Sequence, residues 1–275
     1  MSANQVSVRL ENFPVRLFDA AHEEWESMLR EYTLRGMGGS SQSFDAAEIT
    51  RAGNALRLVA DAADELAQPT GPAEQNTQSA LVPVSAPADF GGLQAVLQEA
   101  RRLASLGELL GLPTLPELAA LRNWLCEEVI NQAAGAAPTP WHLDVEAGDP
   151  DVTTAPDWDD AIQPEQDVAW LIGDDHNRIV AASAAALTLL GWSARDLVGQ
   201  RLVVVIPPHL REAHIASFTR SVLTGTGALL GQPLSLPALA QDGRQIPITL
   251  TLTRHSAGGG RHVYLATLEA EIDPG

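Results

Sequence analysis

The chain has 275 residues, 45% of them hydrophobic, which is enough material for about two folded domains. Its formal net charge is −18, and because an acidic surface repels phosphate backbones, the composition disfavours direct nucleic-acid binding. All 17 basic residues are arginines, which excludes enzymes that need a Schiff-base lysine, a P-loop lysine or the nucleotide-binding lysine of protein kinases.

Redox chemistry and cellular location are also constrained. The single cysteine, Cys126, cannot form an internal disulfide or a multi-cysteine zinc site, and its setting in WLCEEVI at helical spacing predicts a buried thiol. No apolar run approaches the ~20 residues of a membrane span, and the first residues lack the basic and apolar regions of a secretory signal. We therefore expect a cytoplasmic protein with no membrane partner.

Residues 1–137 predict a bundle of four amphipathic helices. In the predicted helices, apolar side chains recur every three or four residues, which places them on one face. We expect the third helix to end at Gly111, and a Thr114–Glu117 capping box to begin the fourth, which runs to about Ala133. The inward positions of the first three helices are Phe18, Ala21, Trp25, Met28 or Leu29, and Tyr32; Ile49, Ala52, Leu56, Val59, Ala63 and Leu66; and Leu93, Val96, Leu97, Ala100, Leu103, Leu106 and Leu110.

Capping residues and proline-rich segments bound these helices. Ser43 or Asp45 can cap the second helix, and Asp89 can cap the third. Residues 68–88 contain four prolines among small and polar residues, so we predict a flexible loop there. Residues 138–165 contain five prolines, eight acidic side chains and no basic one, which predicts an extended, self-repelling linker.

Residues 166–275 predict an antiparallel sheet with short helices. A polar turn joins the first two strands, and isoleucine and leucine alternate with proline and threonine in the second-to-last strand. The predicted elements, in chain order, are strands Ala169–Ile172 and Ile179–Ala181, two short helices ended by Gly191 and Gly199, a longer helix Leu210–Leu223, and strands Gln232–Leu236, Gln245–Arg254 and Val263–Leu268.

This order of elements, together with the words LLGWSARDLVGQ, IPPHLREAHIASF and QDGRQIPITLTL, resembles a PAS domain at about residues 167–268. The resemblance implies a five-stranded antiparallel sheet whose flanking helices enclose a ligand pocket or present a dimer surface. Ser183 departs from the family pattern, in which many members carry Asn at the start of the first helix. Leu121–Val129 and Pro138–Trp141 are similar to an N-terminal helical module fused to PAS domains in actinobacterial signalling proteins. The expected fold class is α+β, a helical bundle followed by a PAS fold.

The sharpest candidate site lies on the predicted helix Leu210–Leu223. A spacing of four puts His214 and Phe218 on one inward face. In the haem-bearing PAS domains of bacterial oxygen sensors, a histidine followed six residues later by an arginine supplies the iron ligand and a propionate contact, and His214 with Arg220 resembles that pair. The alternative is a histidine that is hydrogen-bonded to a neighbouring strand or turn.

The rest of the predicted pocket is apolar. In the place where those oxygen sensors carry a distal arginine, the chain has Leu229, Leu230 and Leu234, which offer no hydrogen bond to bound gas. The cofactor is left open by the sequence. A flavin that forms a cysteine adduct is excluded because residues 167–268 contain no cysteine, and haem stays a candidate, with His214 as its metal ligand only if it binds. The ligand-binding candidates are His214, Arg220, Phe218, Leu230 and Leu234.

No catalytic motif accompanies these residues. Asp174 and Asp175 are expected to be solvated in their turn, and Trp141 and Trp158 to pack locally instead of docking on a partner or on the bundle. The sequence thus predicts a cytoplasmic sensor or regulator with no catalytic output, which acts on a signalling partner in trans and forms a homodimer through the PAS domain, the bundle or both. The alternatives are a haem-binding gas or redox sensor, and a structural adaptor whose PAS core is filled by its own side chains.

Overall fold

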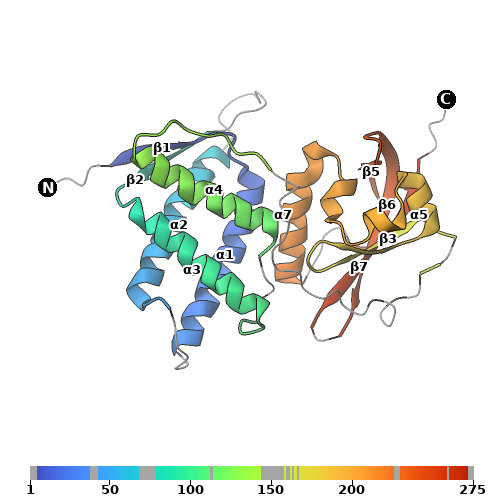
Figure 1. Cartoon of the computed structure of the whole chain (residues 1–275), viewed down its shortest axis with the longest axis horizontal. Coiled ribbons are helices and arrows are strands. Elements are labelled where there is room, and N and C mark those ends of the chain that lie inside the picture. The colour runs from blue at the N-terminus through green and yellow to red at the C-terminus, as the bar shows by residue number, and fades with distance from the viewer. Residues whose placement is uncertain are drawn as a thin grey trace. The chain divides into compact units, whose positions relative to one another are not determined.

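The computed structural model of the chain describes residues 5–37, 43–67, 79–111, 114–143, 158, 162, 164–165, 167–225, 230–258 and 260–271. The chain divides into two compact units, residues 1–151 and residues 152–275, which we call the helical unit and the sheet unit (Figure 1). The first is built mainly of helices and the second around a five-stranded sheet, so the overall class is α+β, as predicted. None of the described helices combines the length and apolar character of a membrane span.

The helical unit packs four helices around a core of large apolar side chains. Trp25, Tyr32, Phe18 and Phe90 are among the largest fully buried side chains of the chain, and the first three of them belong to the predicted inward face of the first helix. A two-stranded antiparallel sheet lies against two of the helices. The elements are β1 (Val6–Leu10), α1 (Val15–Met37), α2 (Ala46–Ala67), β2 (Ala80–Val84), α3 (Ala88–Ser105) and α4 (Pro116–Ala133).

Strand β2 corrects the prediction of a loop over residues 68–88. Its side chains alternate between buried and exposed, as in a strand with one covered face, and it pairs with β1, with Val82 opposite Val8. Pro83 suggested a loop in the sequence, but a strand at the free edge of a sheet tolerates proline. Residues 68–78 of the predicted loop lie outside the described residues.

The end of α3 was also predicted incorrectly. The helix stops at Ser105, and Gly107 follows in the left-handed conformation (φ 71°), which is a conformation that favours glycine and commonly ends a helix. Gly111, the predicted end, therefore lies beyond the helix. Leu106 and Leu110 were expected to face inward but are 59% and 99% exposed, because the chain leaves the helical path before it reaches them.

Of the predicted helix caps, Asp45 of α2 is confirmed, whereas the capping box of α4 is wrong, and Asp89 lies inside α3, which has no side-chain cap. At the start of α2, Glu48 N donates to Asp45 Oδ1 at 2.8 Å and Asp45 N donates to Glu48 Oε2 at 2.7 Å. At the start of α4 the first helical residue is Pro116, so Thr114 lies one position too early to cap it. The buried Thr114 hydroxyl instead donates to Met28 Sδ at 3.1 Å.

Residues 138–143, the predicted start of the linker, are attached to the helical unit. Trp141 is buried, its amide donates to Glu11 O at 2.9 Å, and its ring centroid lies 5.5 Å from that of Trp124. Trp141 is therefore docked on the helical unit, which corrects the expectation that it packs locally within the linker. Residues 144–157 lie outside the described residues.

The sheet unit confirms the predicted hairpin, helices and three later strands. Its antiparallel sheet has the order β4-β3-β7-β6-β5, so the first hairpin and the last strands meet in the middle of one sheet (Figure 1). The first of the three later strands, β5, starts two residues after the predicted position. The elements are β3 (Trp170–Asp174), β4 (Ile179–Ala182), α5 (Ala184–Leu190), α6 (Ala194–Leu197), the 3-10 helix η1 (Leu202–Val205), α7 (Pro208–Thr224), β5 (Leu234–Leu239), β6 (Gln245–Ser256) and β7 (His262–Ala270).

Hydroxyl caps and left-handed glycines delimit the short helices. Ser183 Oγ accepts from Ala186 N at 3.1 Å and from Trp170 N at 2.9 Å, so it caps α5 and also ties the helix to β3. Gly191 ends α5 with φ 71°. Ser193 caps α6, with its hydroxyl accepting from the amide of Asp196. Ser183 thus caps α5 at the position where many family members carry asparagine.

The two faces of the large sheet carry separate apolar clusters. The inner cluster packs the sheet against α5, α6 and η1, and the outer cluster includes Trp158 and Ile162, which precede β3. The Trp158 ring lies 6.3 Å from that of Trp170, which confirms local packing for this second tryptophan. The buried members of the inner cluster are Leu171, Ile179, Ala186, Leu190, Leu197, Val205, Ala238, Ile248 and Leu268.

Candidate functional site

The α7 helix turns His214 and Phe218 toward the sheet unit's interior. The Phe218 ring meets the edge of Tyr264 on β7 at a centroid distance of 5.5 Å, and the His214 and Phe218 rings lie 6.2 Å apart. His214 Nε2 lies 3.0 Å from Asn177 Oδ1, in the turn between β3 and β4. The histidine is therefore hydrogen-bonded to a neighbouring turn, which was the simpler of the two predicted roles.

Asn177 joins three elements of the unit. It is fully buried and adopts the left-handed conformation (φ 59°), which asparagine tolerates better than most residues. Its amide donates to Asp174 O at 3.1 Å, its carbonyl accepts from Leu202 N of η1 at 2.9 Å, and its side-chain oxygen faces His214 of α7. Its Nδ2 atom is buried and has no hydrogen-bond partner, which is a costly arrangement in a protein interior.

His214 is neutral at physiological pH in this environment. Burial lowers the pKa of the imidazole to about 4, and the positive charge of Arg201 lowers the pKa further in the same direction. Because an amide oxygen only accepts, the neutral ring carries its proton on Nε2 and donates to Asn177. The contact is thus a neutral hydrogen bond that holds α7 to the β3–β4 turn.

The turn itself is buried, which corrects the prediction that Asp174 and Asp175 are solvated. Asp175 is 3% exposed, and Arg261 Nε lies 2.8 Å from each of its carboxylate oxygens. The His262 amide donates to the same carboxylate at 3.1 Å, and Asp175 raises the pKa of Arg261. Sequence reasoning missed the ion pair because its partners are 86 residues apart.

Asp174 stabilises the shape of the turn. Burial raises the pKa of its carboxyl group, and the bonds that its Oδ1 atom accepts from the amides of Arg178 at 2.9 Å and His176 at 3.0 Å oppose that rise. Both carboxylates of the turn are therefore committed to internal hydrogen bonds. In the described part of the chain, no three histidine, cysteine or acidic side chains are grouped so that they could hold a metal ion.

The sheet faces α7 with a row of residues from three adjacent strands. Directly opposite partners in an antiparallel ladder share a face, and Tyr264 is opposite both Gly173 on β3 and Arg254 on β6. Two residues along β6, Leu252 pairs with Ala266 and forms a backbone bridge with Leu230. The row thus combines small, aromatic and cationic residues on the inner face.

The remaining predicted site residues are divided by the fold. Leu234 on β5 is opposite Leu250 and so belongs to the inner face, near the bridge made by Leu230. Arg220 follows His214 by six residues, which at roughly 100° per residue places it about 120° away around the α7 axis. The structure brings His214 and Phe218 together but separates Arg220 from their face, and Leu229 lies outside the described residues.

These residues do not fit the haem site considered from the sequence. Iron ligation by His214 Nε2 would break its bond to Asn177 and leave both polar atoms of that buried amide without partners. No step of function is therefore assigned to haem.

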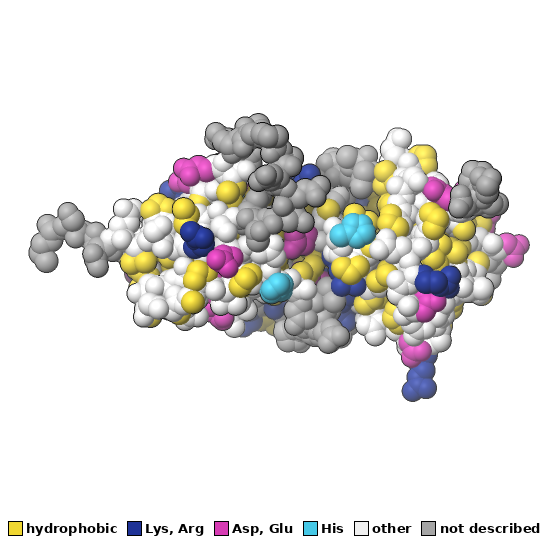
Figure 2. Space-filling model, turned by 90° about the horizontal axis from the view of Figure 1, so that it is seen from above, with side chains coloured by type: hydrophobic (Ala, Val, Ile, Leu, Met, Phe, Trp, Pro, Cys, Tyr) yellow, Lys and Arg dark blue, Asp and Glu magenta, His cyan; other side chains and the backbone are white. Residues whose placement is uncertain are grey.

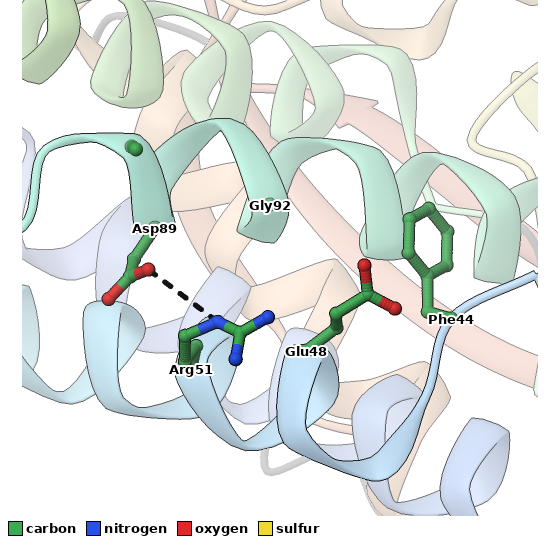
Figure 3. Close-up of a pocket in the computed structure, with 6 residues that line it drawn as sticks. Phe44, Glu48, Arg51, Asp89 and Gly92 are labelled. Carbon is green, nitrogen blue, oxygen red and sulfur yellow. Dashed lines mark ion pairs between the residues drawn. The ribbon is translucent and has the colours of Figure 1, made fainter.

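The helical unit holds a shallow groove and a buried acid. The groove, of about 250 Å³, lies between α2 and α3, and Figure 3 shows Arg51 and Asp89 paired across it with a distance of 3.8 Å between Nε and Oδ1. Glu48, which also lines the groove, is engaged in the cap of α2. The polar groups of the groove are therefore already paired with each other or with the backbone.

The buried acid is Glu24 on α1, which is 7% exposed. Burial raises its pKa to about 8, against the opposing effects of the nearby Thr114 hydroxyl and the charges of Arg101 and Arg122. Cys126 is also buried, and like Glu24 it feels the charge of Arg122. Burial raises the pKa of its thiol to about 12, as expected for a structural cysteine. This cluster carries no exposed nucleophile.

The surface gives no sign of a nucleic-acid interface on the face seen in Figure 2. Acidic and basic side chains are scattered there among apolar and uncharged ones, without a continuous basic area. That distribution agrees with the acidic composition.

Comparison with known proteins identifies the class of the sheet unit. Residues 159–269 match the family described as PAS fold. The five-stranded antiparallel sheet with its flanking helices has the same fold, so this part of the chain is a PAS domain, and such a domain indicates a sensory or regulatory role in signalling.

Individual relatives are distant. The chain is 28% identical over 91 residues to the sensor protein FixL of Bradyrhizobium diazoefficiens, a match that covers 33% of this chain and only 18% of that protein. Among solved structures, a light-oxygen-voltage domain is 20% identical with a TM-score of 0.33, over 39% of this chain and 79% of that chain. The PAS domain of the fruit-fly ELK potassium channel is 15% identical with a TM-score of 0.31, over 38% of this chain and 85% of that chain.

Sequence reasoning missed three residues of the α7-facing row, namely Asn177, Arg254 and Tyr264. One signal for Arg254 was present, because it continues the alternate positions of Ile248 and Leu250 and was therefore predictable as inward-facing. Asn177 could not be found in this way, since a polar turn next to a strand is usually solvated.

Proposed function

We propose that the PAS domain senses a small ligand between α7 and the inner face of the sheet, and that the chain passes its state to a signalling partner in trans. The observation that supports this most directly is the hydrogen bond between His214 and Asn177. Through Asn177, it links α7 to the turn after β3 and to η1. A ligand that displaced α7 would break the His214–Asn177 bond, and the β3–β4 turn and η1 would then lose their link to the helix.

The proposal includes a cytoplasmic chain that has no catalytic output and works as a homodimer. The PAS domain, the helical unit or both would provide the dimer contacts, and the helical unit would engage the partner, as the likeness to actinobacterial signalling modules suggests. Mass measurement by light scattering during size-exclusion chromatography tests the dimer directly. A monomer at all concentrations would remove dimerisation from the proposal.

A structural adaptor is the second candidate, and one observation favours it. The inner cluster already fills the space between the sheet and α5, α6 and η1 with leucine, isoleucine, valine and alanine side chains. If the chain is an adaptor, the sheet residues that face α7, such as Leu252 and Tyr264, would contribute only to packing.

The two candidates differ in what the purified protein retains. We expect native mass spectrometry of the full chain to show one small molecule per protomer, which is released on denaturation and identified in the extract. A chain that retains nothing and gains no thermal stability from a library of small metabolites would favour the adaptor. An intense Soret absorption band that is lost in His214→Ala would contradict the geometric argument against haem.

A further inference from the structure

Arg254 is a half-buried cation on the inner face of the sheet, and the described chain supplies no counter-charge for it. It continues the series of inward side chains on β6 after Leu250 and Leu252. Its guanidinium points toward the C-terminal end of α7, where Nη1 lies 3.6 Å from the position that a Cβ atom on Gly225 would occupy. Among the described residues it makes no hydrogen bond and no ion pair, so its donors remain available.

Two further donors without acceptors lie along the same row. Tyr264 is directly opposite Arg254 in the β6–β7 ladder and is 5% exposed, yet its hydroxyl makes no hydrogen bond within the described residues. Burial raises the pKa of this phenol and the charge of Arg254 opposes the rise, as expected if the two groups are close. The buried Nδ2 of Asn177 is the third donor.

A continuous series of contacts connects these groups around the inward face of α7. Asn177 bonds to His214, the His214 ring lies beside Phe218, and the Phe218 ring meets Tyr264, which pairs with Arg254. The buried Nδ2 of Asn177 is unsatisfied, which is unusual because buried polar groups are nearly always hydrogen-bonded. At the other end of this series, Arg254 and Tyr264 add donors that have no acceptor among the described residues, beside two aromatic rings.

The chemistry of an occupant follows from these donors. Arginine presents a planar fork that matches the two oxygens of a carboxylate, and a phenol can donate to the same anion. Asp175, the acid whose charge acts on Tyr264, is bound to Arg261. The single charge of Arg254 matches a ligand with one negative charge. The edge-to-face rings of Phe218 and Tyr264 favour a ligand whose apolar part is flat.

We propose that the α7-facing end of the inner sheet face binds a small aromatic monocarboxylate, with Arg254 holding the carboxylate and with Tyr264 and Asn177 as additional donors. This inference rests on the proposed sensing function and specifies its ligand class.

Isothermal titration calorimetry on the full chain tests the inference with three probes. Benzoate carries the ring and the charge, benzamide carries the ring without the charge, and inorganic phosphate carries charge without the ring. We expect benzoate to bind, and benzamide to bind roughly tenfold more weakly or worse, since a bond to a charged group is stronger than a neutral one. Phosphate should not bind.

Two variants and a matched control locate the site. Arg254→Gln should weaken benzoate roughly tenfold or more, and Tyr264→Phe, which removes only the hydroxyl, should weaken it several-fold. Arg244→Gln is the control, because Arg244 is 73% exposed and already paired with Asp242 at 2.7 Å. It should leave the affinity unchanged. Thermal melts of all three variants establish that they are folded, and Tyr264→Phe keeps the test decisive if Arg254→Gln does not fold.

The outcomes separate this inference from the function on which it rests. Equal affinity for benzoate in the parent and in Arg254→Gln, or no benzoate binding, overturns the carboxylate site. Benzamide binding as tightly as benzoate also overturns it, while leaving a PAS sensor for a neutral ligand. A neutral metabolite identified in the denatured extract would likewise overturn the carboxylate site and leave a PAS sensor for a neutral ligand. If no probe binds and no molecule is extracted, both the carboxylate site and the sensing function are overturned.

Discussion

Glu24 in the helical unit and Asp175 in the sheet unit are two acids that are buried in opposite ways. In the helical unit, Glu24 is buried and its pKa rises to about 8, so the cost of burying a charge is avoided by protonation at neutral pH. In the sheet unit, Asp175 is buried as an anion and is matched by the guanidinium of Arg261. Arg254 is the exception within the sheet unit, because its charge has no partner in the described chain.

This difference separates structural charge from available charge. A buried group that is neutralised or paired has no capacity left for a ligand, and its removal changes stability. A partly buried cation without a partner keeps its capacity, and its removal should change binding more than stability. The predictions below test each side of this comparison.

The largest expected effect concerns Glu24 in the helical unit. A carboxyl group whose pKa is about 8 in the folded state and 4.5 in the unfolded state favours folding fully below pH 4.5, and that contribution is lost as the pH rises to 8. At 1.36 kcal/mol per pKa unit, the loss is roughly 4 kcal/mol. Glu24→Gln should therefore be more stable than the parent by roughly 4 kcal/mol at pH 8 and about equal to it at pH 4.5.

Urea unfolding at both pH values measures this effect. The control is Glu26→Gln, because Glu26 is half exposed and pairs with Arg30 on the same helix face, where a substitution should change stability by less than about 0.5 kcal/mol at either pH. A parent chain whose stability does not fall between pH 5 and pH 8 relative to Glu24→Gln would show that Glu24 is ionised and compensated.

The next effect concerns the paired charge of the sheet unit. Asp175→Ala should destabilise the chain by about 3 kcal/mol, because it leaves Arg261 without its partner and removes the acceptor for the His262 amide. The matched control is Asp242→Ala, whose carboxylate pairs with Arg244 in an exposed turn and should contribute less than about 1 kcal/mol. Equal losses in the two variants, measured by denaturant unfolding, would contradict the assignment of a buried, structural ion pair.

A smaller effect compares a cap in each unit. Ser183→Ala removes an oxygen that accepts from two amides, one in α5 and one in β3, and should cost about 1.5 kcal/mol. Asp45→Ala removes one cap bond at an exposed helix start and should cost about 1 kcal/mol or less. Thermal unfolding of both variants ranks them, and the reverse order would mean that the bond from Ser183 to β3 contributes nothing.

Much of the fold follows from local patterns in the sequence. The apolar spacing from Phe18 to Tyr32 predicted the buried face of α1, and the alternation in β6 predicted its inner and outer faces, because both periods are set by backbone geometry alone. The hairpin, the serine caps and Gly191 were predictable for the same reason, since each depends on contacts within a few residues. The resemblance to a PAS domain added the prediction that the five strands form one antiparallel sheet.

The tertiary structure decided which polar groups are buried. Strand β2 exists because β1 lies beside it, although Pro83 suggested a loop, and the turn at Asp174 and Asp175 is enclosed by segments distant in the chain. The contact of His214 with Asn177 likewise joins α7 to the turn between β3 and β4, and the guanidinium of Arg254 on β6 lies at the C-terminal end of α7 with no acidic partner among the described residues. Sequence spacing determines which side of a helix or strand a residue occupies. Packing between distant segments determines what surrounds that side, and therefore which charges a site can offer a ligand.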